Sequence, residues 1–281
     1  NSQQQPPDLQ RQAQINDLIR VTGIGPSHAA KLVSKNITLI KLIAEWGHFI
    51  TLHPDNSILM LDKLGEVSTT TGKSKKQVSE ATIHKRRLKL LEAKLKDTKF
   101  LKYINHHQLV GLKYLADIEM RIPRYEIVEI EKVLKKFCNL VNSDLHITIC
   151  GSYRRGNPDS GDIDVLISHP SILESSDMNQ PYLRCLIHHL TECGFLIDHL
   201  TMVGNTKYMG ICKLNTCGNS LGRRIDIRFV PWNSYAAAIL YFTGSKDFNT
   251  NMRSIALSKG YTLNEYGIYK LVEQKVEGGK K

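Results

Sequence analysis

Two aspartates stand one residue apart at the start of an apolar segment, in the run "DIDVLIS". On a β-strand, residues i and i+2 point to the same face and lie about 6.6–6.8 Å apart. The pattern therefore predicts that Asp162 and Asp164 project together while Ile163 turns into a core. Carboxylates that share a face repel each other and raise each other's pKa unless a cation lies between them.

A third aspartate, Asp226, lies in a second alternating segment, "RRIDIRF", with Ile225 and Ile227 on the opposite face. Neighbouring strands lie about 4.8 Å apart, so the three carboxylates can converge on one site. This donor set is rich in oxygen and lacks thiolate or clear histidine partners, which favours Mg²⁺ over zinc. Two Mg²⁺ ions about 3.5–4 Å apart are an arrangement that proteins use for phosphoryl and nucleotidyl transfer.

The residues ahead of the paired acids are suited to phosphate. Gly151 and Ser152 leave a strand into a turn, where backbone N–H groups and a hydroxyl can hold phosphate oxygens. Arg154 and Arg155 add guanidinium groups, and Ser160-Gly161 forms a second permissive backbone. A lone Asp-x-Asp is more often an exposed strand end, but the turn ahead of it and the later Asp226 favour a metal site.

The elements that position these residues divide the 281-residue chain into an α+β arrangement. We expect a loose polar end at 1–12, a helical subdomain at 13–122, a central subdomain with a mixed sheet and the carboxylates at 123–232, and a small C-terminal subdomain at 233–281. Helical spacing predicts two short helices between 15 and 46, joined by the glycine turn 22–27. Other expected elements are a turn-rich segment at 47–75, a basic helix at 75–96, further helix at 101–122, a helix opened by Pro123, a helix at 180–193, and strands at 145–152, 162–168, 206–214 and 223–231. The last subdomain is expected to begin helical and to end in short strands.

The formal charge of +11 at pH 7 predicts a polyanionic partner, most simply nucleic acid, with an anionic membrane surface as the lesser alternative. No apolar run reaches the roughly 20 residues that span a bilayer, and the first residues lack the apolar core of a signal peptide. The six cysteines are scattered without CxxC pairs, which indicates free thiols in a reducing, intracellular compartment.

The segments "GSYRRG", "SGDIDVLI", "RRIDIRFVP" and "LYFTGSKDFNTNMRSIALSKGYTLNEYGIY" resemble the nucleotidyltransferase superfamily, and within it the beta-like family X DNA polymerases. The resemblance implies that 13–122 is a DNA-binding subdomain, 123–232 a palm and 233–281 a nucleotide-binding subdomain. It implies that Asp162, Asp164 and Asp226 bind two catalytic Mg²⁺ ions, with Asp226 at the primer 3′-hydroxyl and Arg224 beside it. It also implies three groups of substrate contacts: triphosphate contacts at Arg121, Ser152, Arg155, Ser160 and Gly161; a sugar and nucleotide platform at Tyr241, Phe242 and Gly244; and contacts to base and template at Asn249 and Arg253.

The segment "RVTGIGPSHAAKL" resembles the helix-hairpin-helix of the same family. Glycines allow a close approach of the backbone to phosphate, and the next helix presents its amides. The residues expected to contact DNA here are Gly23, Gly25 and Ser27. By resemblance, the carbonyls of Ile19, Val21 and Ile24 hold a monovalent cation, Na⁺ or K⁺. A plain helical turn is the alternative.

This chain also departs from the family pattern. Lys246 stands in place of an acidic residue near the incoming base, and Thr250 stands in place of a lysine that touches the template. The segment 47–102 is longer than the matching connection in the family. Its basic helix either binds additional DNA backbone or simply exposes its charged face to solvent. The family's lyase domain has no counterpart here, so no lyase activity is expected.

The resemblance implies a DNA-directed DNA polymerase that adds dNTPs to gapped or primed DNA in base excision repair. The expected state is a nuclear monomer that works with other repair proteins and without a membrane; a mitochondrial location is the alternative. Two other functions stay open, namely a template-independent nucleotidyltransferase and a DNA-binding repair fragment whose catalysis has lapsed.

Overall fold

The computed structural model describes residues 7–52, 89–91, 93–178, 180–214 and 221–271. Its contacts divide the chain into two compact units, each built from separated stretches of sequence. The first unit comprises 1–121, 187–204 and 208–225, and the second comprises 122–186, 205–207 and 226–281. The predicted boundaries of the three subdomains stay predictions. Within the described residues, no helix is long and apolar enough to cross a membrane.

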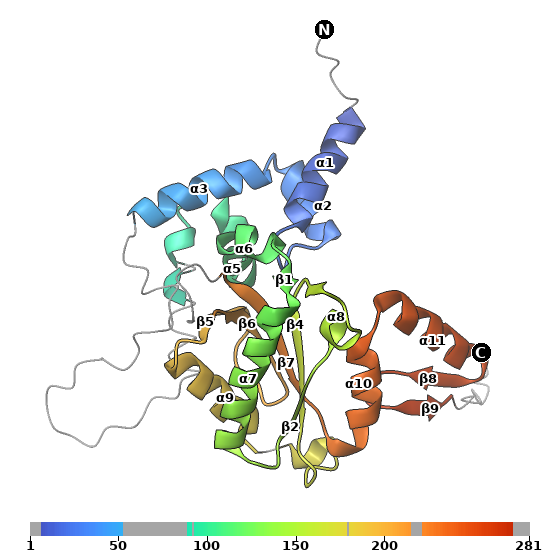
Figure 1. The fold of residues 1–281 in the computed structure, drawn as a ribbon. Helices are drawn as coiled ribbons and strands as arrows, with labels where there is room; N and C mark the ends of the chain where they lie inside the picture. The colour runs from blue at the N-terminus through green and yellow to red at the C-terminus, as the bar shows by residue number, and fades with distance from the viewer. Residues whose placement is uncertain (1–6, 53–88, 92, 179, 215–220, 272–281) are drawn as a thin grey trace, which may run out of the picture. The chain divides into compact units, whose positions relative to one another are not determined.

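The first unit is mainly helical (Figure 1). Its leucine-rich core includes Leu18, Leu42, Leu101 and Leu109, each with 0% exposure. Its elements up to Glu119 are α1 (Pro7–Ile19), α2 (Pro26–Ser34), α3 (Leu39–Leu52), the 3-10 helix η3 (Leu101–Tyr103), α5 (His106–Lys113) and α6 (Leu115–Glu119).

Three predictions for this unit need correction. Residues 7–12, expected in a loose end, belong to α1, which begins at Pro7. Two helices were expected between 15 and 46, but α2 ends before Asn36, whose positive φ of 59° reverses the chain, and α3 follows as a further helix. α3 also continues through 47–52, where turns were expected, because Phe49 packs into the core. The glycine turn between α1 and α2 is confirmed.

Most of the predicted basic helix lies outside the described residues, including Lys85, Arg86 and Arg87. Residues 89–91 and 93–95 are helical, and Lys96 lies in the turn that follows. Leu91 and Leu95 are buried in the core of the first unit. The end of this segment is therefore amphipathic, with its lysines outward.

The strands and remaining helices bear out the predicted α+β class (Figure 1). Five strands follow the order β2-β4-β7-β6-β5, and the boundary between the two units passes through β6 and β7. β2 pairs antiparallel with β4, with Ile149 opposite Val165. These elements are β1 (Ile122–Pro123), α7 (Arg124–Val141), β2 (His146–Ile149), α8 (Gly151–Arg154), β3 (Asp159–Ser160), β4 (Ile163–Ser168), η4 (Ser175–Asp177), α9 (Tyr182–Glu192), β5 (Leu196–His199), β6 (Lys207–Cys212) and β7 (Arg223–Phe229).

The C-terminal elements follow the predicted order of helix and then short strands. They are η5 (Trp232–Ser234), α10 (Tyr235–Thr243), α11 (Lys246–Ser258), β8 (Tyr261–Leu263) and β9 (Ile268–Lys270), with β8 and β9 paired antiparallel. A small core joins α10 to the sheet through Leu166, Val230 and Ala238. The five described cysteines are free thiols, and Cys217 lies outside the described residues.

Candidate active site

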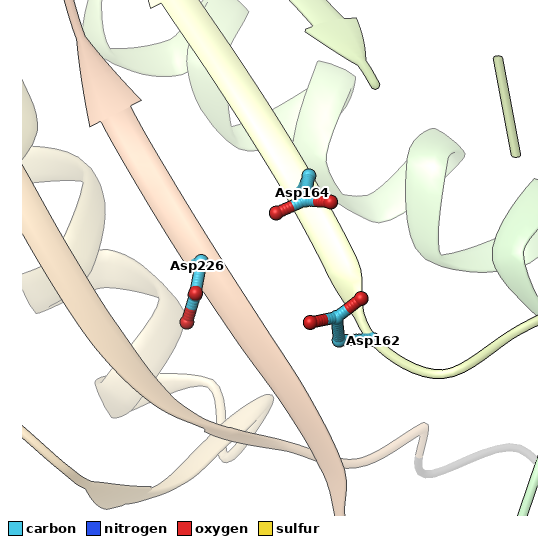
Figure 2. Close-up of side chains that lie close together, drawn as sticks. All are labelled: Asp162, Asp164 and Asp226. Atoms are coloured by element: carbon cyan, nitrogen blue, oxygen red, sulfur yellow. The ribbon is translucent and has the colours of Figure 1, made fainter. Parts of the chain in front are cut away.

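The three predicted acids meet in the second unit (Figure 2). Asp162 directly precedes β4 and Asp164 lies within it, while Ile163 and Val165 are buried on the opposite face. Asp226 lies on β7 between the fully buried Ile225 and Ile227. One carboxylate oxygen from each acid lies within 4.8 Å of the others. The alternating pattern has thus placed three acidic groups from two strands at one point.

The electrostatics of these acids fit a divalent cation. Burial, and next the negative charge of Asp226, raise the pKa of Asp164 to about 6, while Arg155 and Arg228 oppose this rise. Asp164, Val165, Asp226, Arg228 and Phe242 line a small pocket. Three half-buried carboxylates without a thiolate form an oxygen donor set that suits Mg²⁺. A cation between them would relieve the repulsion that raises the pKa of Asp164.

The predicted phosphate turn contacts the acids directly. Gly151 has a positive φ of 59°, and a Cβ atom at this position would lie 2.5 Å from Oδ2 of Asp164. The backbone N–H of Cys150 donates to the carbonyl of Asp164 at 2.7 Å. The Ser152 hydroxyl donates to the hydroxyl of Ser160 at 2.7 Å. The two serines predicted at the triphosphate therefore lie together beside the acids, with Gly161 exposed next to Ser160.

Two arginines connect this turn to α10. Arg154 donates to the hydroxyl of Thr243 at 2.9 Å, and Arg155 donates to the carbonyl of Thr243 at 2.7 Å. Both guanidinium groups use only Nη1 in these bonds, and both residues are exposed. The next residue, Gly244, lies close to Arg155, since a Cβ on it would be 3.4 Å from the guanidinium. The structure thus brings Arg155 and Gly244 together, while their predicted roles in nucleotide binding stay predictions.

The predicted nucleotide platform lies at the junction of α10 and α11. Asn249 donates to the carbonyl of Tyr241 at 2.7 Å. Tyr241 and Phe242 meet edge to face, with their ring centroids 5.1 Å apart. Phe242 also lines the pocket of the acids. Arg253 is exposed on α11.

Sequence reasoning missed two arginines of this unit. Arg228 lies 5.6 Å from the centroid of the Phe242 ring and lines the pocket. Because it stands two residues after Asp226 on β7, the same alternation that places Asp226 could have identified it. Arg124 donates to the carbonyls of Tyr153 and Asn157 and so fixes the phosphate turn. No local pattern in the sequence indicates this contact.

Two other predicted residues, Arg121 and Arg224, fall in the first unit. Arg121 is exposed just before β1, and Arg224 is half-buried on β7. Their predicted roles at the triphosphate and the primer stay predictions.

The helix-hairpin-helix lies wholly in the first unit. Gly23 has a φ of 88°, and its carbonyl accepts a bond of 2.8 Å from the buried amide of Gln108. Gly25 is the N-cap of α2, and no side chain caps this helix. The backbone N–H groups of its first turn are therefore available to bind a phosphate. Ser27 is exposed in that first turn. The carbonyl of Val21 accepts from the N–H of Ile24 at 2.9 Å. The cation expected at the carbonyls of Ile19, Val21 and Ile24 stays a prediction.

Two parts of the chain are similar to domains of known proteins. Residues 121–232 match the family model of the DNA polymerase beta palm, and residues 238–281 match that of the DNA polymerase beta thumb. DNA polymerase lambda of Rattus norvegicus is 37% identical over 190 residues, which cover 66% of this chain and 32% of that protein. The lambda polymerase of Arabidopsis thaliana is 33% identical over 184 residues, covering 62% and 34%.

A more distant relative is the human DNA-directed DNA/RNA polymerase mu, 22% identical over 195 residues, which cover 59% of this chain and 39% of that protein. The chain thus spans about a third of the length of the curated relatives it matches. Since these relatives are of the lambda and mu types, the matches support the family and do not single out its beta type. Residues 121–232 and 238–281 thus resemble the palm and thumb domains of the DNA polymerase beta family.

Proposed function

We propose that this chain is the polymerising part of a family X DNA polymerase. It would add a dNTP to the 3′-hydroxyl of a primer on gapped DNA, with the incoming base chosen by the template. The observation that carries this proposal is the meeting of Asp162, Asp164 and Asp226 beside a glycine–serine phosphate turn. The palm and thumb matches support the same activity.

We assign each group of residues a role in binding metal, nucleotide or DNA. The three aspartates would hold two Mg²⁺ ions, which supply Lewis-acid activation of the primer hydroxyl and neutralise charge on the leaving pyrophosphate. Ser152, Ser160 and the amides of the turn would bind the triphosphate, with positive charge from Arg155 and Arg228. Tyr241, Phe242, Gly244 and Asn249 would hold the sugar and base, and Arg253 the template. Arg121 and Arg224 would join the triphosphate and primer contacts.

The cellular role belongs to the same proposal. The resemblance to the family supports short-gap filling in base excision repair, carried out together with other repair proteins. It also supports a nuclear location and a monomeric state. The monovalent cation at the helix-hairpin-helix rests on it too. The positive charge of the chain supports DNA as the partner.

Gap filling tests the proposal. The chain is incubated with DNA that carries a one-nucleotide gap, Mg²⁺ and each dNTP separately, and Asp226→Ala serves as the inactive control. We expect extension only with the nucleotide that pairs with the template, and a loss of at least about 10³-fold in the control, because a metal ligand is removed. Extension with any nucleotide would instead favour a template-independent nucleotidyltransferase. Binding without extension would favour a DNA-binding fragment.

A further inference from the structure

Four lysines of the first unit surround two aromatic rings. Lys35 and Lys102 lie 5.2 and 5.6 Å from the centroid of the Tyr103 ring. Lys41 and Lys99 lie 5.8 and 5.2 Å from the centroid of the Phe100 ring. We call these four lysines and two rings the lysine–aromatic patch. It joins the end of α2 and the first turn of α3 to η3, and it is distinct from the glycine turn and from the acids.

A set of hydrogen bonds from α3 anchors the backbone of the patch. Both oxygens of the Glu45 carboxylate, on α3, accept backbone N–H groups: Lys99 at 2.5 Å, Phe100 at 2.7 Å and Leu101 at 2.8 Å. Leu101 itself is fully buried in the core of the first unit. The backbone that carries two of the four lysines is therefore fixed.

The patch carries an excess of positive charge. Among the ion pairs of the described residues, none joins these four lysines to a carboxylate, whereas Lys113, Lys132 and Lys135 each have one. Glu45, whose oxygens accept the N–H groups of 99–101, supplies one negative charge against the four positive charges of the lysines. Two ammonium groups near each ring repel each other, and the ring faces offset this only in part. An anionic ligand would relieve the repulsion, and Tyr103, which is 40% exposed between two of the lysines, leaves them open to such a ligand.

We propose that the lysine–aromatic patch binds the phosphate backbone of DNA as a second contact, separate from the helix-hairpin-helix. This rests on the proposed function, in that DNA is the ligand. α2 begins at the hairpin and has Lys35 as its C-cap, so its nine residues separate the two contacts by about 13 Å. That distance is roughly four base pairs along the axis of a duplex. Lysines meet phosphates as point charges, so the patch adds affinity and register without reading sequence.

The test compares two double variants that remove the same charge. Lys35→Gln/Lys102→Gln acts on the patch, and Lys132→Gln/Lys136→Gln acts on the exposed side of α7. Affinity for a fluorescent duplex of about 20 base pairs is measured without nucleotide over a salt series. Each lysine–phosphate pair contributes about −0.9 to the slope of log K against log salt. The patch variant lacks two such pairs, so its slope should be less negative than that of the wild type by about 1.8. The α7 variant should keep the wild-type slope.

Binding is read without turnover, so this test is independent of catalysis and can be repeated in the Asp226→Ala chain. Equal slopes for the two double variants, at unchanged melting temperatures, would overturn the proposal. Unchanged DNA binding together with weakened binding to poly-glutamate would also overturn it, in favour of an acidic protein partner. A chain that binds DNA through the patch yet adds no nucleotide would refute the proposed polymerase function and leave the patch standing.

Discussion

At the scale of single residues, Gly151 couples the phosphate turn to the acids. Its positive φ of 59° is a conformation that costs an ordinary L-residue about 1–2 kcal/mol. The missing side chain matters as well, because a Cβ would lie 2.5 Å from the carboxylate of Asp164. One position therefore sets both the path of the turn and the place of a metal ligand.

We predict that Gly151→Ala lowers single-nucleotide incorporation by at least about tenfold, because the methyl group displaces Asp164 from its position beside Asp226. Gly156→Ala is the matched control: its φ is 84°, but a Cβ there meets no atom within 4 Å. Both variants should lose stability by about 1–2 kcal/mol from backbone strain. Steady-state incorporation and urea unfolding measure the two effects. Equal activity losses in both variants would contradict a specific contact with Asp164.

At the scale of elements, a buried ion pair ties α5 to β5. Nζ of Lys113 lies 2.9 Å from Oδ2 of Asp198, whose side chain has 0% exposure. Burial raises the pKa of Asp198, and Lys113 opposes that rise. The other carboxylate oxygen accepts the backbone N–H of His199 at 3.0 Å. The carboxylate is thus satisfied on both sides, and removal of its lysine would leave a buried charge alone.

We predict that Lys113→Met destabilises the first unit by about 3–5 kcal/mol, since it keeps most of the apolar stem and removes only the partner charge. Adding Asp198→Asn in the same chain should restore much of this loss, because no uncompensated charge then remains. The free energies of unfolding of the two single variants and the double variant, measured in urea, give the coupling free energy between Lys113 and Asp198. If the losses of the single variants simply add, the pair is not energetically coupled.

Also at this scale, the sequence predicted the elements whose faces are encoded by alternation. In "DIDVLIS" and "RRIDIRF" the buried isoleucines assign the aspartates to the other face, so the site was predictable once the strands were taken as neighbours. Residues 7–12 gave no such signal, since a polar helix end lacks an apolar period. The contacts of Glu45 with η3 and of Arg124 with the phosphate turn join distant parts of the chain. Such contacts depend on tertiary packing and leave no local pattern.

At the scale of the whole molecule, the acidic site opposes folding stability. Asp164 has an ordinary pKa of 3.8 that burial and Asp226 raise to about 6. Between these values the folded chain binds more protons than the unfolded chain, so its free energy of unfolding falls as pH rises. The loss begins near pH 4 and is complete above about pH 6. The convergence of the acids is thus retained at a cost in stability, as is common at functional sites.

We predict that, without Mg²⁺, Asp164→Asn gains stability relative to the wild type as pH rises from about 4 to 6, by about 2–3 kcal/mol. Asp226→Asn should shift this change to lower pH, because the like charge that helps raise the pKa of Asp164 is gone. Saturating Mg²⁺ should reverse the dependence in the wild type alone, since the cation binds the ionised acids of the folded state. Urea unfolding across this pH range, with and without Mg²⁺, measures all three. A constant difference between wild type and Asp164→Asn at every pH would show that Asp164 titrates alike in the folded and unfolded chain, and would refute its electrostatic coupling to Asp226.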